Sequence, residues 1–149
     1  MSDKAIGYEE YLKQTGRLTY TFHGRSMLPL LREGRDLFIV EEPARTPGRR
    51  DVILFKRADR YVLHRIVGQD ESGYITRGDN NYFEERGIKG EDVLGVMTGY
   101  VRAGHEHSVH SPAYICYAYV RVADYPLRRL LHRIIGRLRR LRIRSQASQ

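Results

Sequence analysis

Three short stretches of the chain hold the residue types that serine hydrolysis requires. They are HGRSMLPLL around Ser26, VLHRIVG around His64 and TRGDNNYFEER around Asp79. A serine hydroxyl is a poor nucleophile at its own pKa, so a neighbouring base must accept its proton. A histidine suits this task because its ordinary pKa of roughly 6.5 lies close to working pH. An acid bonded to the other ring nitrogen would fix the tautomer and stabilise the imidazolium. The three stretches therefore predict nucleophilic catalysis by a serine.

These stretches resemble the type I signal peptidases, and more broadly the superfamily that includes the LexA-type self-cleaving repressors. The resemblance runs from about residue 22 to residue 100. The matching segments are Gly24, Ser26-Met27, Pro29, Gly34, Asp36 with the apolar run 37–40, then 51–55, 64–67, 78–81 and 94–96. The resemblance implies that Ser26 is the nucleophile and that its own backbone N–H is an oxyanion donor.

The residue at position 64 indicates the branch of this superfamily. Most bacterial signal peptidases and the LexA-type proteins have a lysine there. A histidine followed by arginine, with GDNN downstream, resembles the archaeal and endoplasmic-reticulum branch. By that resemblance His64 is the general base and Asp79 a catalytic or supporting acid. The branch usually has two aspartates shortly after GDNN, and this chain has Glu84 and Glu85 at the matching positions. Whether Glu85, one methylene longer, takes the second acidic role stays open.

Each candidate also has a structural interpretation. Ser26 could serve as a turn or capping residue, and Asp79 could shape the turn at Asn80-Asn81. Glu85 could equally be an exposed loop carboxylate. The regular order of the three stretches, each beside a strand-like run, favours the catalytic interpretation for Ser26 and Asp79.

His64 lies in a segment that alternates as strands do. It shares one side of that strand with Val62 and Ile66, so it is expected to point toward an apolar face. Burial there would favour its neutral form, which a general base requires. Arg65 points to the other side and is expected to pair with an acid.

Turn residues divide the chain into short segments, which predicts an α+β fold that is mainly β. Strands are expected at residues 18–22, 36–41, 51–56, 60–67, 74–77 and 93–101. Short strands with frequent turns favour an antiparallel arrangement over βαβ units. We therefore expect a small curled antiparallel sheet or partial barrel, as the resemblance also implies. A short helix over residues 4–14 should precede the sheet and stop at Gly16, and residues 27–32 should form one helical turn.

Three segments are expected along the chain. Residues 1–17 form a helical lead-in, residues 18–104 the catalytic β-domain, and residues 105–149 a C-terminal extension. The histidines at positions 105–110 are interpreted as a polar loop. Leucine and isoleucine then recur at helical spacing between arginines, which predicts an amphipathic helix over residues 126–144.

The positive charge is concentrated in that last segment. The chain has a net charge of +8, and residues 125–149 contain eight arginines and no acid. Basic amphipathic helices bind anionic membrane surfaces. The alternatives are a partner protein or simple packing of the leucine stripe on the β-domain. Nucleic acid is disfavoured, because the tail lacks interleaved aromatic residues.

The absence of certain sequence features bears on cofactor binding and on cellular location. Its single cysteine, Cys116, lies in an aromatic run and is expected to be buried, and the chain has no metal-ligand spacing. We expect neither a cofactor nor a metal. No secretory signal is visible, and the longest apolar run, residues 113–123, is about half the roughly 20 residues that span a bilayer. A cytoplasmic protein, free or peripheral on the inner face of the membrane, is therefore expected.

These observations favour a serine endopeptidase of signal-peptidase type, whose partner is a peptide or protein with an extended leader or signal-like cleavage segment. A LexA-like self-cleaving regulator is an alternative, although it is disfavoured by His64 and by the lack of an N-terminal DNA-binding domain. The second alternative is a non-catalytic module that binds peptides or membranes on the same fold. The substitution of Glu84-Glu85 for the aspartate pair gives that alternative some support.

Overall fold

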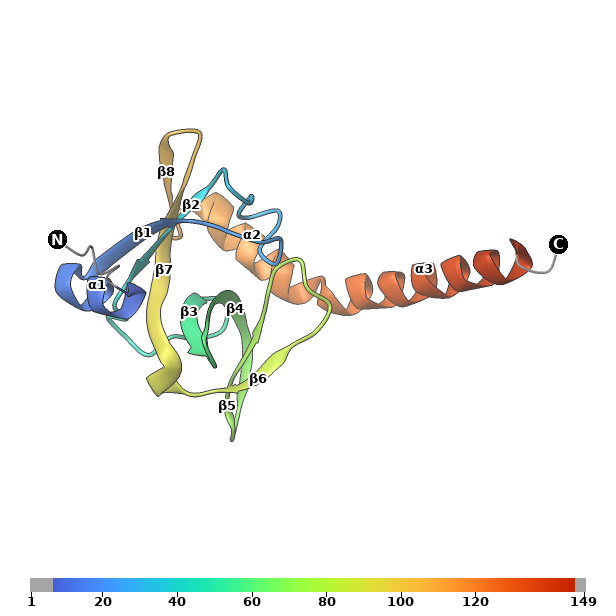
Figure 1. Ribbon diagram of the computed structural model, residues 1–149, viewed down its shortest axis with the longest axis horizontal. Coiled ribbons are helices and arrows are strands. Elements are labelled where there is room, and N and C mark those ends of the chain that lie inside the picture. Colours follow the sequence, from blue (N-terminus) through green and yellow to red (C-terminus); the bar gives the residue numbers. More distant parts are fainter. Residues whose placement is uncertain (1–6, 147–149) are drawn as a thin grey trace.

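The computed structural model describes residues 7–146, with side chains described as far as Arg137. Within this part of the chain, eight strands form one antiparallel sheet that is not closed into a barrel, and three α-helices accompany it (Figure 1). The strands are β1 (Arg17–Thr21), β2 (Leu37–Glu41), β3 (Val52–Arg57), β4 (Arg60–Asp70), β5 (Gly73–Arg77), β6 (Glu85–Ile88), β7 (Val93–Arg102) and β8 (His105–Ser108). The predicted mainly β, α+β fold is confirmed.

The sheet is organised around β7. The strand order is β1-β2-β7-β3-β4-β5-β6, and β8 also pairs with β7. β2 pairs along one edge of β7, so β3 and β8 share the other edge. On that edge, β3 lies opposite residues 93–96 of β7 and β8 lies opposite residues 99–102. Register shifts in β2, β3 and β4 bend the ladder. Bulges of this kind increase the local twist of a sheet, which accounts for its curled form.

The apolar core lies on both faces of β3. Val52 and Leu54 belong to the larger apolar cluster, whereas Ile53 and Phe55 belong to the smaller one. Successive side chains of a strand point to opposite faces, so a strand buried on both faces reads as an unbroken apolar run. The same rule places His64 and Arg65, which pair with Ile53 and Val52, on opposite faces of β4.

The predicted strands match β1–β5 and β7 closely, but two strands were missed. β6 is mostly polar, and every residue of β8 is exposed. Neither has the alternation that marks a half-buried strand. The histidine-rich stretch expected to be a polar loop therefore contains β8, and the domain boundary predicted at residue 104 falls in the turn of the β7–β8 hairpin.

The N-terminal helix and the helical turn predicted over residues 27–32 agree with the structure in part. α1 comprises Tyr8–Thr15 and ends at Gly16, whose φ of 70° is left-handed, as the expected stop requires. Residues 4–6 of the predicted helix lie outside the described residues. Residues 26–30 form consecutive turns, and Leu31 N–H donates to the Met27 carbonyl (3.0 Å) as in one helical turn.

Two helices follow the sheet. α2 (Pro112–Ala123) was not predicted, although Ser111 caps it by accepting a hydrogen bond from Tyr114 N–H (3.3 Å) and Pro112 is its first residue. Cys116 on this helix is exposed, so the expected burial of its thiol is wrong.

α3 (Tyr125–Gln146) confirms the predicted C-terminal helix and extends away from the sheet (Figure 1). The predicted stripe positions Leu138 and Leu141 lie outside the described side chains. In the described part of the chain, none of the three helices combines the length and apolar content needed to cross a bilayer.

Candidate active site

Ser26 lies on the loop between β1 and β2, and buried side chains of the same loop hold it against the apolar core. The side chains of Met27 and Leu31 are fully buried in the larger apolar cluster. At the base of the loop, Phe22 N–H donates to the Asp36 carbonyl (3.0 Å). Ser26 itself is half-buried on top of these anchors. The apolar side chains that follow it thus fix the backbone that carries its hydroxyl.

A buried carboxylate, Asp36, ties the same loop to β7 through two partly exposed arginines. Asp36 accepts hydrogen bonds from the Arg32 backbone (3.0 Å) and from the Arg32 and Arg102 guanidinium groups (2.9 Å each). Burial alone would raise the pKa of Asp36, but these hydrogen bonds outweigh it and hold the pKa well below its usual range. Arg102 also donates to the Leu30 carbonyl (2.7 Å). The ionised carboxylate is therefore part of the loop's anchoring.

The GDNN stretch packs directly against Ser26. Asn80 N–H donates to the Ser26 carbonyl (2.7 Å). A β-carbon added at Gly78 would lie 2.6 Å from that carbonyl oxygen and 2.9 Å from the Ser26 β-carbon. Gly78 is thus required for close approach of two backbones, and the stretch positions the serine through its main chain.

His64 is buried on β4 and is held by one carboxylate. Its ring lies edge-on to Phe55, with the ring centroids 6.3 Å apart. Its Nδ1 is 2.9 Å from Oε2 of Glu85, the first residue of β6. An ionised carboxylate can only accept a hydrogen bond, so this contact assigns the proton to Nδ1. The other ring nitrogen, Nε2, is then an acceptor, as a general base requires.

Burial sets the protonation state of this histidine. It lowers the pKa of His64 below its ordinary value, and the charge and hydrogen bond of Glu85 oppose this only in part. The imidazole is therefore neutral near pH 7 and available to accept a proton.

Ser26, His64 and Glu85 line one cavity of about 310 Å³. The rest of its wall is mostly aromatic and aliphatic and includes Tyr8, Tyr20, Phe38, Leu54, Tyr61 and Phe83. An apolar hollow with a few convergent polar groups is the usual form of a ligand site. Within the described residues, no hydrogen bond joins the Ser26 hydroxyl to His64. The structure thus brings three of the four predicted site residues to one cavity.

His23 is a second histidine in the cavity wall. It is exposed, and no carboxylate of the described residues bonds to its ring. His64, by contrast, is buried and paired with Glu85. A base needs a partner that fixes its tautomer, so the geometry favours His64.

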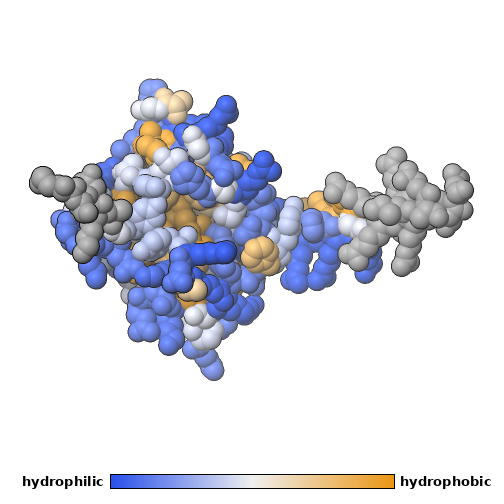
Figure 2. All heavy atoms as spheres, in the orientation of Figure 1, coloured by the Kyte–Doolittle hydropathy of each residue, from blue (hydrophilic) through white to orange (hydrophobic). Residues whose placement is uncertain are grey.

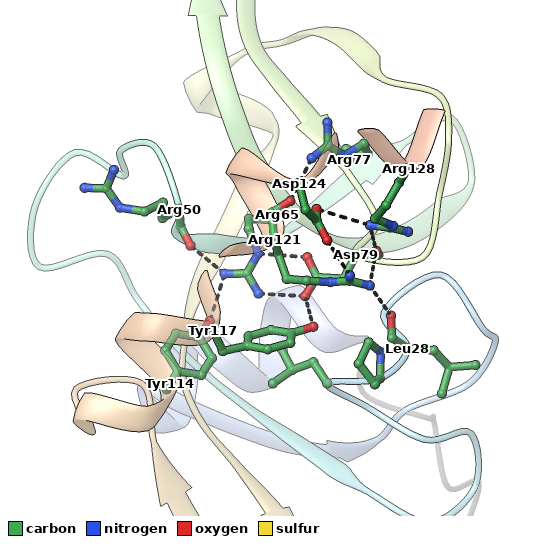
Figure 3. A network of polar contacts seen from close by, with 12 residues as sticks. Leu28, Arg50, Arg65, Arg77, Asp79, Tyr114, Tyr117, Arg121, Asp124 and Arg128 are labelled. Atoms are coloured by element: carbon green, nitrogen blue, oxygen red, sulfur yellow. Dashed lines mark hydrogen bonds and ion pairs between the residues drawn. The ribbon is translucent and has the colours of Figure 1, made fainter. Parts of the chain in front are cut away.

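Asp79, the fourth predicted site residue, lies with Arg65 rather than with His64 (Figure 3). Its two carboxylate oxygens accept hydrogen bonds from Arg65 Nε (2.8 Å) and Arg65 Nη2 (2.7 Å), and Tyr117 Oη donates to one of them (2.8 Å). Both ionic side chains are almost fully buried. The expectation that Arg65 pairs with an acid is confirmed, and among the two candidate acids the partner of His64 is Glu85.

The C-terminal helices hold the backbone around Asp79, a role that the sequence did not reveal. Arg121 donates to the carbonyls of Asp79 (2.8 Å) and Leu28 (3.4 Å), and Arg128 also donates to the Asp79 carbonyl (2.8 Å) (Figure 3). Asp124 lies between the two arginines, 3.0 and 3.7 Å from their nitrogens. These residues make up a clamp on the loops that carry Ser26 and Asp79. No local pattern marks it, because every contact depends on tertiary structure.

A scan against protein-family models finds no family that matches this chain, and a search of the curated proteins finds no matching relative. Among the described residues, no three His, Cys, Asp or Glu side chains are grouped so as to bind a metal ion.

Proposed function

We propose that this protein is a serine endopeptidase of signal-peptidase type, with Ser26 as nucleophile, His64 as general base and Glu85 as the acid that orients it. One observation carries the proposal: the three side chains line one cavity, and His64 Nδ1 bonds to Glu85 at 2.9 Å. Asp79 is assigned a supporting role, because its carboxylate is occupied by Arg65 and Tyr117.

The chemistry follows from the orientation of the imidazole. His64 Nε2 accepts the proton of the Ser26 hydroxyl as the oxygen attacks a peptide carbonyl carbon. The imidazolium that results is stabilised by the Glu85 carboxylate and then donates its proton to the leaving amine. A water molecule, deprotonated by His64 in turn, attacks the acyl-enzyme and releases Ser26. The Ser26 backbone N–H is proposed as one oxyanion donor, in accord with the resemblance.

The proposed substrate is a leader or signal-like peptide bound in extended form. The mostly apolar cavity wall supports small and apolar side chains near the cleaved bond. By the same proposal the protein acts in the cytoplasm or at the inner face of the membrane, on a leader peptide or on a membrane-proximal segment.

The test is cleavage of a diverse peptide library, followed by mass spectrometry. Wild type should cut a defined set of peptides, and Ser26→Ala and His64→Ala should both lose this cleavage. Ser72→Ala and His105→Ala are matched controls, because both residues are exposed and neither lines the cavity. They should cut the same peptides as wild type.

Two outcomes would overturn the proposal. If the purified protein cuts itself at one bond and cuts no peptide in trans, it is a self-cleaving regulator. If it binds peptides in the cavity but wild type cuts no more than Ser26→Ala, it is a peptide-binding module on the same fold.

A further inference from the structure

α3 exposes a continuous apolar stripe. It consists of Leu127, Leu130, Leu131, Ile134 and Ile135, which are 44–61% exposed. With 3.6 residues per turn, these five positions fall within an arc of about 140° on the helix surface. A stripe of this width normally faces the core of a protein. Here the stripe belongs to neither apolar cluster of the described structure and about half of its surface is exposed, so packing within the protein does not explain it.

The residues of α3 that contact the body lie beside the stripe and not within it. Tyr125 Oη donates to the Tyr82 carbonyl (3.1 Å), and Arg128 donates to the Asp79 carbonyl (2.8 Å). The His132 ring stacks on Tyr82 with the ring centroids 4.1 Å apart. The helix is thus attached by its polar side. For the described positions of the stripe, the alternative in which it packs on the β-domain is wrong, because these side chains are exposed.

Positive charge borders the stripe. Arg129, Arg133 and Arg137 are exposed on α3, and residues 125–149 contain no acid. Figure 2 shows hydrophobic side chains along one side of this helix and hydrophilic ones along the other. The exposed surface of α3 therefore combines an apolar stripe with positive charge that no acid of residues 125–149 balances.

We propose that the apolar stripe of α3 binds the surface of an anionic phospholipid membrane, with the helix parallel to the bilayer plane. Apolar side chains on such a helix enter the boundary between headgroups and acyl chains, while its arginines contact anionic headgroups. The inference is independent of the peptidase proposal.

Charge argues for lipid and against a second copy of the chain. Two copies joined through this stripe would bring two segments of eight arginines each into contact, with no acid in either segment to balance them. Like charges at an interface oppose association. An anionic bilayer offers both an apolar layer and the opposite charge at the geometry that α3 presents.

Membrane binding through α3 would also place the cavity close to the bilayer. Tyr82, which α3 contacts in three ways, precedes the highly exposed Phe83 of the cavity wall. The loop that joins the cavity to α3 is thus held on the helix by a hydrogen bond, a ring stack and the Arg128 guanidinium.

The first test measures co-sedimentation of the full chain with phosphatidylcholine vesicles, with and without phosphatidylserine. Wild type should bind only the vesicles with phosphatidylserine, and added salt should weaken binding. Replacing Arg129, Arg133 and Arg137 together by glutamine should reduce the affinity on the order of a hundredfold, at about a factor of five per arginine. The matched control replaces Arg35, Arg49 and Arg60, which are exposed on the β-domain, and should bind as wild type.

The second test removes the apolar contribution. Leu130→Glu with Ile134→Glu should abolish vesicle binding, because both side chains lie in the stripe. Thr46→Glu with Gln69→Glu adds the same charge at exposed positions of the body and should retain most of the binding. Circular dichroism identifies variants that are not folded, and only folded variants are compared.

Three results would overturn the proposal. The first is that folded wild type does not bind phosphatidylserine vesicles, and the second is that both α3 variants bind as wild type does. The third is that wild type self-associates without lipid and Leu130→Glu with Ile134→Glu dissociates it in analytical ultracentrifugation. That result would make the stripe a contact between copies. Because no cleavage is measured, none of these results bears on the peptidase proposal.

Discussion

Two neighbouring residues of β4 form two base–acid pairs with opposite properties. His64 makes one hydrogen bond to Glu85 (2.9 Å) and lines the cavity. Arg65 makes two hydrogen bonds to Asp79 (2.8 and 2.7 Å) and is buried. The acid of the first pair is 20% exposed, whereas that of the second is 2% exposed and also accepts a bond from Tyr117.

The difference in burial and hydrogen bonding supports a structural role for the Arg65–Asp79 pair and leaves the His64–Glu85 pair for the proposed chemistry. A buried ion pair is tolerated only when its remaining hydrogen-bonding groups are satisfied, and Arg65 meets this condition through the Arg50 carbonyl and the Tyr114 hydroxyl. Both oxygens of Asp79 are engaged by Arg65, and Tyr117 donates to one of them, whereas no hydrogen bond joins Asp79 to His64 in the described structure. The less saturated acid, Glu85, leaves its imidazole free on one side, and that free side is where chemistry can occur.

Loss of the imidazole should have the largest effect. We expect His64→Ala to lower kcat/KM by on the order of 10⁴–10⁶, because nothing else would accept the Ser26 proton. The measurement is cleavage of a peptide identified in the library. His107→Ala should change kcat/KM little, because His107 lies in β8, where it stacks on Tyr100 of β7. If activity survived in His64→Ala but not in His23→Ala, the base would be His23.

Glu85→Gln should lower kcat/KM by about 10²–10⁴, because the amide has no charge to stabilise the imidazolium and can favour the wrong tautomer. Steady-state kinetics at neutral pH measure this loss. Glu84→Gln is the matched control, since Glu84 contacts Arg86 (3.1 Å) in the described structure and not His64. Equal losses in both variants would remove the distinction between these acids.

Asp79→Asn should act mainly on stability. It leaves the buried Arg65 charge without its counter-charge, which costs about 3–5 kcal/mol of unfolding free energy. Urea denaturation measures this change. Asp70→Asn removes an exposed pair with Arg86 and should cost no more than about 1 kcal/mol. If Asp79→Asn were as stable as wild type yet inactive, Asp79 would belong to the chemistry and the comparison would fail.

Gly78→Ala tests whether the GDNN stretch positions Ser26, the proposed nucleophile. The added β-carbon would displace Ser26, and we expect kcat/KM to fall by about 10–100-fold. Gly68→Ala should be tolerated, because its β-carbon would meet Ile75 Cδ1 at an ordinary 3.6 Å. Peptide cleavage by both variants, with melting temperatures as a check on folding, decides the matter. Equal activity would show that Ser26 is not sensitive to this contact.

The pH dependence should show the smallest effect. Because burial lowers the pKa of His64, the acidic limb of the kcat/KM profile should lie below the ordinary value of about 6.5. Glu85 raises this pKa, so Glu85→Gln should move the limb to still lower pH. Stability should fall as the pH drops through about 6.5, because the unfolded chain takes up the proton first. A limb above 6.5 in wild type would contradict this.

The sequence predicted those parts of the fold that local patterns encode. Apolar runs or apolar alternation between turn residues marked six of the strands, and the leucine spacing marked α3. β8 was missed because none of its side chains is buried, so nothing in its composition differs from a loop. The β-branched and aromatic residues of α2 hid a helix whose start, Ser111-Pro112, was readable.

The candidate site was predicted residue by residue, but not its pairing. Ser26, His64, Asp79 and Glu85 stood out as types, yet the choice of acid for His64 depends on β6 lying beside β5. The clamp of Arg121 and Arg128 was not predictable for a similar reason. Its partners are main-chain carbonyls, which have no signature in the sequence.

That clamp links completion of the site to the order of synthesis. Ser26, His64 and Glu85 all precede residue 86, whereas the arginines that hold the Leu28 and Asp79 carbonyls come 93, 42 and 49 residues after their partners. Synthesis proceeds from the N-terminus, and a contact can form only after both of its residues have been made. A growing chain thus contains Ser26 and His64, the proposed nucleophile and base, before it contains the arginines that hold the Leu28 and Asp79 carbonyls. The arrangement of the site is therefore complete only after α3, which carries Arg128, has been made.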